Sequence, residues 1–457
     1  MIEKTKLQKI FKEYDIRGKY PEDFDNGTAY QIARAFVDHA KPKHVVLAVD
    51  FRCESKLAGQ SFMAGLIDGG ADVSNLGVNA TPILFFAVGK NKFDGGVMVT
   101  ASHNPAGYTG FKICGSNGVV YGSADKLKKI SKLISHHKYQ KLNKKKKTSP
   151  LNVLDGYNRF IASLVDFKNI KDLEVVLDSS GGASAKVVSH VFSRLKVKTI
   201  KINFKANDGH SDHGLNPMLP ENQRSAKVAV KKYKSDLGII FDGDGDRCIF
   251  IDETGQFVEP YHLNCMLVQI ILNRWPKSKI IIDARLSLGL SETIMGAGGQ
   301  PIVHRAGYSN IVRTMSQKKI IFGCENSGHY MFNFSMSPRE RINYVFGDSI
   351  IPVLMVMEHL KQHNLSLSEA ILPFRQKYHI SGEINLQGVD FASVRKKLKK
   401  RYWKYKIKQI DGLSVYGRDW FFNVRPSHTE PLVRINIEAT SKKILADLKK
   451  KLMIIIK

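Results

Sequence analysis

Leu237-Gly-Ile-Ile-Phe-Asp242-Gly-Asp244-Gly-Asp246-Arg247 is the most informative stretch of this chain. Its apolar run 237–241 predicts a buried strand, and three carboxylates that alternate with glycines follow directly. Because glycine permits a tight turn, several carboxylate oxygens can face one point. Mg²⁺ binds through carboxylates together with a phosphate, and the guanidinium of Arg247 suits a phosphate. The stretch therefore predicts a strand that ends in a site for a metal-dependent reaction on a phosphate group.

Two other interpretations of this stretch are open. Counted from Asp242, acidic residues fall at positions 1, 3 and 5 and Glu253 falls at position 12, as in a calcium-binding EF-hand. Against this, position 6 is Arg247, where an EF-hand loop needs glycine. In addition, the following segment 248–251 predicts a strand where an EF-hand needs a helix. A solvated acidic turn between two strands is the second alternative.

Length and composition indicate a globular protein of several domains. The 457 residues exceed what one hydrophobic core accommodates, so three or four domains are expected. Hydrophobic residues make up 43% and charged residues 25%, which is ordinary for globular proteins. The apolar runs are short and broken, and the first residues lack a signal-peptide core, so no membrane segment is expected. Five scattered cysteines without a Cys-x-x-Cys pair predict reduced thiols and a cytoplasmic location.

The formal net charge of +28 has three explanations. It can reflect a nucleic-acid surface, a field that attracts anionic substrates, or a general enrichment of solvated surfaces in lysine. The lysine cluster 144–147 carries no interleaved aromatic residues, whereas Tyr402, Trp403 and Tyr405 follow the basic cluster 397–401. Lysine enrichment is the preferred explanation and nucleic-acid binding the least favoured, so the charge alone identifies no function.

A unit of strand, polar turn and helix recurs along the first three quarters of the chain. The segment 44–50 predicts a strand and 55–68 the helix after it, and a further strand at 95–100 leads into the polar stretch 101–105. The same succession recurs at 173–183 and at 279–290. Three such units predict three related α/β domains with mixed sheets.

The last quarter has a different pattern. Four short strands are predicted at 378–385, 412–416, 420–424 and 432–438, together with helices at 390–402 and 442–453. Strands that alternate this closely with two helices predict an α+β domain with an antiparallel sheet. The predicted domains span residues 1–148, 149–251, 252–366 and 367–457.

Four polar segments occur in a characteristic order. They are Thr100-Ala-Ser-His-Asn-Pro105, Asp242–Arg247, Gly323-Cys-Glu-Asn-Ser-Gly-His329 and Arg425-Pro-Ser-His-Thr-Glu-Pro431. Together with 11–18 and Gly110-Phe-Lys112, this order resembles the α-D-phosphohexomutase family, which includes phosphomannomutases, phosphoglucomutases and phosphoglucosamine mutases. The resemblance spans essentially the whole chain. It implies four domains around a central cleft, each of which provides one loop.

The resemblance also implies a role for individual residues. Ser102 would be the phosphorylated serine, and Mg²⁺ would be held by Ser102 together with Asp242, Asp244 and Asp246. Glucose 1,6-bisphosphate or an equivalent compound would act as activator. Further catalytic side chains would be those of Lys112, Arg247, Arg285 and His329. Substrate would be bound by Tyr14, Arg17, Tyr308, Glu325, Ser327, Arg425, Ser427 and Thr429.

The implied reaction interconverts hexose 1-phosphate and hexose 6-phosphate through a phosphoserine and a 1,6-bisphosphate. Mannose is the expected sugar and glucose the second candidate. Phosphoglucosamine mutase is the nearest alternative, and a divergent, weakly active sugar-phosphate-binding paralogue is another. The expected partner is a phosphorylated hexose, with neither a membrane nor nucleic acid involved, and the chain would act as a monomer or a homodimer.

The chain departs from the phosphomannomutase-like pattern at four sites, one of which is a pair of residues. Arg285 stands where lysine is usual, Tyr308 where histidine is common, and His428 where asparagine or glycine is usual. Gly347-Asp348 replaces a more acidic pair. Because arginine does not readily release a proton, proton transfer would fall more heavily on His329, or Arg285 would only stabilise the transferring group.

Overall fold

A computed structural model describes residues 4–116, 118–122, 126–136, 146–206, 213–334, 344–427 and 432–456. The chain divides into two compact units, each made of three segments. Unit 1 comprises Met1–Phe257, Tyr308–Lys319 and His329–Asn364. Unit 2 comprises Val258–Gly307, Ile320–Gly328 and Leu365–Lys457.

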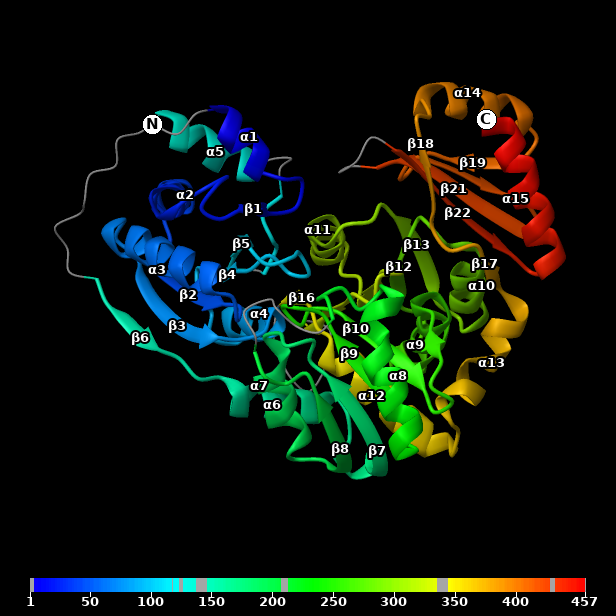
Figure 1. Ribbon diagram of the computed structural model, residues 1–457, viewed down its shortest axis with the longest axis horizontal. Helices are drawn as coiled ribbons and strands as arrows, with labels where there is room; N and C mark the ends of the chain where they lie inside the picture. The colour runs from blue at the N-terminus through cyan, green and yellow to red at the C-terminus, as the bar shows by residue number, and fades with distance from the viewer. Residues whose placement is uncertain are drawn as a thin grey trace. The chain divides into compact units, whose positions relative to one another are not determined.

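The N-terminal sheet of unit 1 is mixed. Its described strands lie in the order β1 (Ile16–Lys19), β5 (Tyr108–Gly115), β4 (Gly95–Val99), β2 (His44–Val49), β3 (Asp72–Val78) and β6 (Thr148–Pro150). From β4 to β6 the strands are parallel, whereas β5 runs antiparallel to both β4 and β1. The helices are α1 (Lys4–Ile10), α2 (Asn26–Ala40), α3 (Cys53–Asp68), α4 (Thr81–Lys90) and α5 (Lys126–His136). Helices α2 and α3 pack on each other, and α3 and α4 contact β2 (Figure 1).

A second mixed sheet of unit 1 carries the predicted strand 237–241. The strands β10 (Cys248–Asp252), β9 (Leu237–Phe241), β7 (Lys171–Asp178) and β8 (Lys196–Ile202) lie in this order. Strand β10 is antiparallel to β9, and β9, β7 and β8 are parallel. Every residue of β9 is buried, as its unbroken apolar run predicts. The associated helices are α6 (Leu154–Leu164), α7 (Ser184–Phe192) and α8 (Arg224–Tyr233), with 3₁₀ turns η1 (Phe167–Asn169) and η2 (Pro220–Gln223).

The third region contributes elements to both units. In unit 1, α11 (Tyr308–Lys318) precedes the antiparallel pair β15 (Tyr330–Asn333) and β16 (Val345–Gly347), and α12 (Ile350–His363) follows. In unit 2, β12 (Lys279–Asp283) pairs in parallel with β13 (Gln300–His304) and β14 (Phe322–Cys324). Helices α9 (Pro260–Arg274), α10 (Leu288–Gly296) and α13 (Leu367–Lys377) belong to unit 2, and β11 (Phe257–Val258) precedes them. The strand–turn–helix unit expected at 279–290 is therefore confirmed as β12 and α10.

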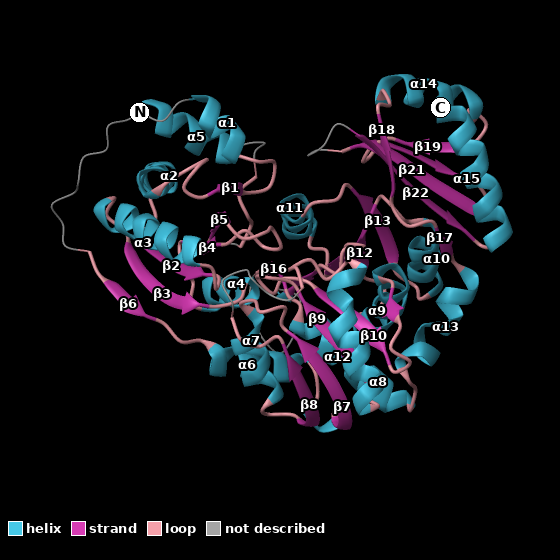
Figure 2. Ribbon diagram, viewed as in Figure 1, coloured by secondary structure: helices cyan, strands magenta, loops and turns pink. Residues whose placement is uncertain are grey.

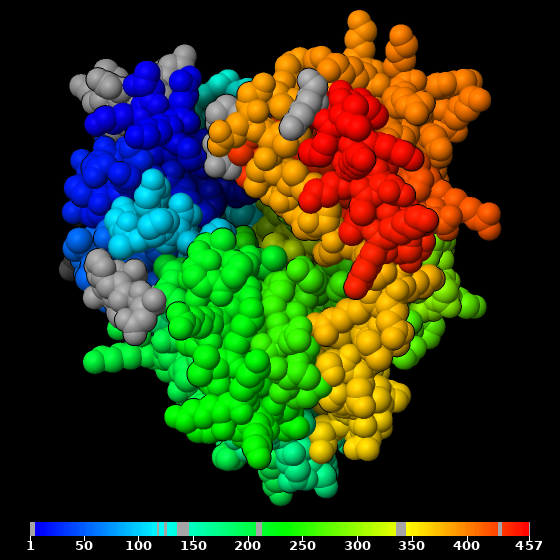
Figure 3. Space-filling model, turned by 45° about the vertical axis from the view of Figure 1, so that its right-hand side comes forward, coloured from blue at the N-terminus to red at the C-terminus, as the bar shows by residue number. Residues whose placement is uncertain are grey.

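The C-terminal sheet of unit 2 is antiparallel throughout its described pairs. The order is β17 (His379–Ile380), β22 (Leu432–Ala439), β21 (Trp420–Pro426), β20 (Leu413–Tyr416) and β19 (Lys406–Lys408), with β18 (Ile384–Gln387) also paired to β22. Helices α14 (Phe391–Arg401) and α15 (Lys442–Ile456) pack on each other and against the sheet (Figure 2). Leu452 of α15 is buried, while Ile454 lies on the outer face of this helix, which Figure 3 shows in red.

The fold class expected from the sequence is confirmed. Mixed α/β sheets are followed by an antiparallel α+β domain. The strand expected at 378–385 is instead two short strands, because Gly382 adopts a left-handed conformation (φ 68°) between them. All five cysteines are free thiols, as their scattered positions predicted. In the described part of the chain, no helix combines the length and the apolar character needed to cross a membrane.

Candidate active site

The loop Asp242–Arg247, here called the aspartate loop, connects β9 to β10. These strands form an antiparallel hairpin in which Phe241 pairs with Cys248. An EF-hand loop lies between two helices, so the calcium-loop interpretation is wrong. Asp242, Asp244 and Asp246 are buried, so the loop is not a solvated acidic turn either.

The two glycines of the aspartate loop allow neighbouring loops to approach closely. A Cβ atom on Gly243 would lie 2.4 Å from the backbone oxygen of Ser102. Gly245 has a φ of 71°, and a Cβ atom there would lie 3.1 Å from Cβ of Ala80. The alternation of aspartate with glycine therefore aims the carboxylates. It also brings the aspartate loop into contact with residues 100–108, which lead from β4 into β5 and are here called the serine loop.

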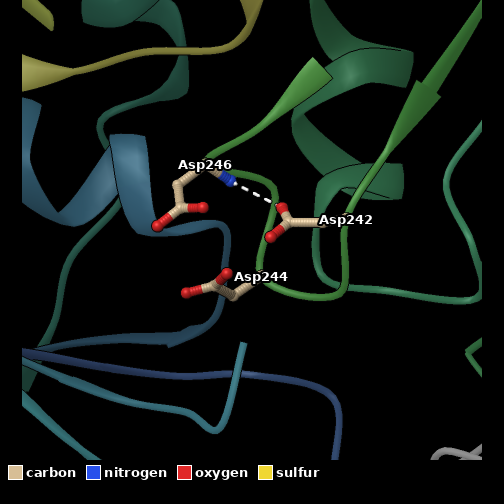
Figure 4. A group of neighbouring side chains, drawn as sticks. All are labelled: Asp242, Asp244 and Asp246. Atoms are coloured by element: carbon tan, nitrogen blue, oxygen red, sulfur yellow. Dashed lines mark hydrogen bonds between the residues drawn. The ribbon is translucent and has the colours of Figure 1, made fainter. Parts of the chain in front are cut away.

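The three carboxylates converge on one point (Figure 4). One oxygen from each lies within 4.8 Å of the others. Asp242 Oδ1 accepts hydrogen bonds from the backbone N–H groups of Asp246 (3.0 Å) and Arg247 (3.2 Å). Among the described residues, buried Oδ1 atoms of Asp244 and Asp246 have no hydrogen-bond partner. Buried carboxylate oxygens without donors are what a hard divalent cation binds, so these residues fit Mg²⁺.

Lys112 on β5 supplies positive charge to this cluster. Its Nζ lies 2.6 Å from Oδ2 of Asp244 and 2.6 Å from Oδ2 of Asp246. Burial lowers the pKa of Lys112, but the two carboxylates outweigh burial and raise the pKa above its ordinary value. Burial, followed by repulsion from Asp246 and Asp244, raises the pKa of Asp242 well above its ordinary range. The cluster therefore favours either a proton on Asp242 or additional positive charge.

Ser102 lies in the loop after β4, beside the aspartate loop. Its Oγ lies 3.2 Å from Asp242 Oδ2 and 3.2 Å from Nδ1 of His103. Its backbone is left-handed (φ 54°), and its N–H donates to Oγ1 of Thr100 at 2.8 Å. Burial, with the positive charge of Arg247 next, lowers the pKa of His103 well below its ordinary value. A neutral imidazole therefore flanks the serine hydroxyl.

Arg17 and Tyr14, both expected to bind substrate, belong to the N-terminal segment of unit 1. Arg17 on β1 donates from Nη1 to Oδ1 of Asn104 at 2.7 Å and forms an ion pair with Asp15. Tyr14 is half-buried between α1 and β1. The guanidinium of Arg17 is thus tied to the serine loop, and Tyr14 precedes it by three positions.

Arg247 and His329 complete the expected residues around the aspartates in unit 1. Arg247 Nε lies 3.8 Å from Oδ2 of Asp242, and His329 Nε2 lies 3.9 Å from Oδ2 of Asp246. The ring of Tyr308 stacks on His329 with centroids 4.8 Å apart and planes 6° apart. Tyr308 Oη accepts a hydrogen bond from the backbone N–H of Gly347 at 3.0 Å. Tyr308, expected to bind substrate, thus also fixes the plane of the His329 imidazole.

The remaining expected residues belong to unit 2. Glu325 follows β14, is buried, and accepts a hydrogen bond from the N–H of Gly307 at 2.8 Å. Ser327, two residues later, is partly exposed. The guanidinium of Arg285 is paired with Asp283: Nε of Arg285 donates to Oδ2 of Asp283 at 2.6 Å.

The expected phosphate-binding turn follows β21. Arg425 is buried and donates from Nη2 to Oε2 of Glu383 at 3.2 Å, and Glu383 also pairs with Arg434 at 3.0 Å. The N–H of Ser427 donates to the backbone oxygen of Leu432 at 2.8 Å. The expected Thr429 lies outside the described residues, as does His428.

Three residues at the site were not expected from the sequence. Thr81 donates from Oγ1 to Asp244 Oδ2 at 2.6 Å, Asn104 binds Arg17, and Arg52 binds the serine loop. Each follows the carboxyl end of a strand of the N-terminal sheet. Side chains at that edge of a parallel sheet commonly form binding sites, and this rule was the signal that could have identified them.

Comparison with known proteins finds one family along nearly all of the chain. Four domains of the phosphoglucomutase/phosphomannomutase family match in order: alpha/beta/alpha domains I, II and III at residues 8–141, 155–255 and 259–378, and the C-terminal domain at 385–455. A phosphomannomutase of Escherichia coli strain K12 is 33% identical over 440 residues, which is 94% of either chain. A phosphomannomutase of Methanocaldococcus jannaschii is 31% identical over 441 residues, 96% of this chain and 95% of that one.

A solved structure leads to the same family. The crystal structure of a phosphoglucomutase/phosphomannomutase family protein from Burkholderia thailandensis has a TM-score of 0.87 at 25% sequence identity, and the match covers 100% of this chain and 98% of that one. The fold, the buried aspartate loop and these matches define a sugar-phosphate mutase, an intramolecular phosphotransferase of the isomerase class. The chain belongs to the phosphoglucomutase/phosphomannomutase family.

Proposed function

We propose that this enzyme interconverts hexose 1-phosphate and hexose 6-phosphate through a phosphoserine at Ser102 and a 1,6-bisphosphate intermediate. Mannose phosphate is the proposed main substrate and glucose phosphate the second, in line with relatives named phosphomannomutase. The observation that carries the proposal is the placement of Ser102 Oγ 3.2 Å from Asp242 Oδ2 in a buried triad of carboxylates.

In the proposed first step, the free hydroxyl of the substrate attacks the phosphorus of phosphoserine 102. The new sugar O–P bond forms as the P–Oγ bond breaks, and the hydroxyl proton passes to the imidazole of His329. In the second step Ser102 Oγ attacks the other phosphate of the bisphosphate, and the departing sugar oxygen takes up a proton. The net reaction moves the phosphate between two positions of one sugar and restores phosphoserine 102.

Charge stabilisation in this scheme comes from residues around the aspartate loop. Mg²⁺, held by Ser102, Asp242, Asp244 and Asp246, would neutralise charge on the transferring phosphoryl group. Lys112 and Arg247 place fixed positive charges at the same loop. A bisphosphate such as glucose 1,6-bisphosphate would load Ser102 initially.

The proposed substrate contacts outside the aspartate loop follow the family resemblance. Arg285 would stabilise the transferring group, Glu325 and Ser327 would bind sugar hydroxyls, and the remote phosphate would be held by Arg425, Ser427 and Thr429. The free thiols fit a reducing cytoplasm, which we propose as the location.

Turnover of the purified protein on mannose 1-phosphate, glucose 1-phosphate and glucosamine 6-phosphate tests this function. Mg²⁺ and a trace of glucose 1,6-bisphosphate are present, and Ser102→Ala is compared with Ser74→Ala, a buried serine that contacts His44. We expect turnover in the wild type and Ser74→Ala and none in Ser102→Ala. Full activity of Ser102→Ala would refute the phosphoserine scheme, and conversion of glucosamine 6-phosphate alone would refute the mannose assignment.

A further inference from the structure

Arg52 is a fully buried arginine that contacts the backbone of the serine loop. It lies between β2 and α3, and its side chain has no exposed surface. A buried guanidinium must find acceptors for its donors. Its two terminal nitrogens donate to four backbone oxygens of one loop: Nη1 to Pro105 (2.8 Å) and Tyr108 (3.1 Å), and Nη2 to Ser102 (2.9 Å) and Asn104 (2.7 Å).

A buried carboxylate holds this guanidinium in place. Nε of Arg52 lies 3.3 Å from Oδ2 of Asp50, and Asp50 Oδ1 accepts a hydrogen bond from the backbone N–H of Arg52 at 3.0 Å. Asp50 is itself wholly buried. The guanidinium is therefore fixed to the end of β2, and the serine loop is fixed to the guanidinium.

The loop needs such support because its backbone is strained at the nucleophile. Ser102 has a φ of 54°, a left-handed conformation that costs a residue other than glycine about 1 kcal/mol or more. The carbonyl of Ser102 is bound by Arg52 and also lies against Gly243 of the aspartate loop. Because Arg52 and Gly243 hold the carbonyl of Ser102, the seryl side chain is directed so that its Oγ lies beside Asp242.

We infer that Arg52 is a positioning residue for phosphoryl transfer at Ser102. By binding the backbone of residues 102–108, it holds the seryl Oγ at the aspartate loop without touching the substrate. This inference rests on the proposed function. It adds the requirement that Arg52 keep Ser102 Oγ in place, because a displacement of about 1 Å at the reacting atom is enough to lower the rate about a hundred-fold.

The test compares Arg52→Met with Arg34→Met. Arg34 on α2 is a matched buried arginine, 4% exposed, that donates from Nη1 to Oη of Tyr30 at 3.2 Å. For Arg52→Met we expect kcat about a hundred-fold below wild type with KM unchanged, and slower labelling of Ser102 by a labelled bisphosphate. Arg34→Met is expected to keep the wild-type kcat. Unchanged kcat and labelling in Arg52→Met would overturn the inference.

Two further measurements separate positioning from general loss of fold. Arg52→Lys keeps the positive charge but has fewer donors in a different geometry, so we expect an intermediate kcat. Added guanidinium ion is expected to raise the activity of Arg52→Ala and not that of Arg34→Ala. Hydrogen exchange over residues 102–108 should be faster in Arg52→Met than in Arg34→Met even if the wild type shows no turnover. Absent turnover would then reject the proposed function, whereas equal exchange would reject the role of Arg52.

Discussion

The Nζ atom of Lys112 lies 2.6 Å from Oδ2 of Asp244, and 132 residues of sequence separate the two side chains. Lys112 belongs to the N-terminal sheet and Asp244 to the hairpin of the second sheet. The same Nζ also lies 2.6 Å from Asp246 Oδ2. A lysine from one domain thus pairs with two carboxylates of the next domain, the same carboxylates whose Oδ1 atoms would bind a divalent cation.

Replacing Lys112 by methionine tests this shared use. We expect Lys112→Met to bind Mg²⁺ more tightly than the wild type, because the carboxylates lose the ammonium group that competes with the ion. Turnover should fall by about a hundred-fold, because a fixed charge at the phosphoryl group is lost. Calorimetric titration with Mg²⁺ and steady-state kinetics measure the two effects, with exposed Lys129→Met as control. Weaker Mg²⁺ binding in Lys112→Met would contradict this account.

Asp244→Asn removes one charge from the aspartate loop while keeping the shape of the side chain. We expect turnover to fall and the Mg²⁺ concentration for half-maximal activity to rise, because one anionic ligand becomes a neutral amide. Asp236→Asn is the matched control, since Asp236 is exposed just before β9 and accepts a hydrogen bond from the N–H of Glu174. If both variants respond to Mg²⁺ like the wild type, the aspartate loop has only a structural role.

Tyr308 separates the effect of ring stacking from that of the hydroxyl. In Tyr308→Phe the stack on His329 remains, and only the acceptor for the N–H of Gly347 is lost. We expect thermal stability to fall by the equivalent of about 1–3 kcal/mol with turnover retained. Tyr308→Ala should lower kcat, because the imidazole of His329 loses the ring that fixes its plane. Equal kcat for the two variants would show that stacking does not orient His329.

The local motifs of this site could be predicted from the sequence, but the contacts between them could not. Asp242–Arg247 and Ser102 follow strands whose apolar runs are visible in the sequence, and their loops lie where those strands predicted them. The position of Arg52 after a strand end is visible in the sequence, but its role is not, since its partners are backbone oxygens about fifty residues away that any sequence provides. The strand break at Gly382 depends on one backbone angle, which composition does not reveal. The domain boundaries predicted at residues 148, 251 and 366 stay predictions.

Arg285→Lys restores the residue that is usual in the phosphomannomutase-like pattern. The guanidinium of Arg285 is paired with Asp283, and an ammonium can keep that pair while also releasing a proton. We therefore expect a kcat equal to or above that of the wild type. Steady-state kinetics on mannose 1-phosphate measures it, with Arg274→Lys on α9 as control. A collapse of kcat in Arg285→Lys alone would show that the guanidinium itself is required.

Glu438 on β22 links the C-terminal domain to α9 and α10 within unit 2. The hydroxyl of Tyr261 and the backbone N–H groups of Leu288 (3.0 Å) and Gly289 donate to its carboxylate. Burial is the main cause that raises the pKa of Glu438 to about 7, with Glu292 adding repulsion. The carboxyl group therefore holds a proton in the folded protein at pH values where an unfolded glutamate is ionised.

This raised pKa predicts how stability changes with pH. Between pH 4.5, the ordinary value, and pH 7, the folded state binds a proton that the unfolded state lacks, so stability falls as pH rises through this interval. Glu438→Gln keeps a hydrogen-bond acceptor but does not ionise. The variant therefore lacks the pH-dependent change of about 3 kcal/mol in the free energy of unfolding that Glu438 causes. Melting temperatures of wild type and variant below pH 4.5 and above pH 7 measure the effect. Because the buried carboxyls of Asp50 and Asp348, whose pKa values are also raised, are present in both proteins, their contributions cancel. The melting temperature of Glu438→Gln should rise relative to that of the wild type as pH rises. If the difference between the two melting temperatures does not change with pH, Glu438 is ionised in the folded protein.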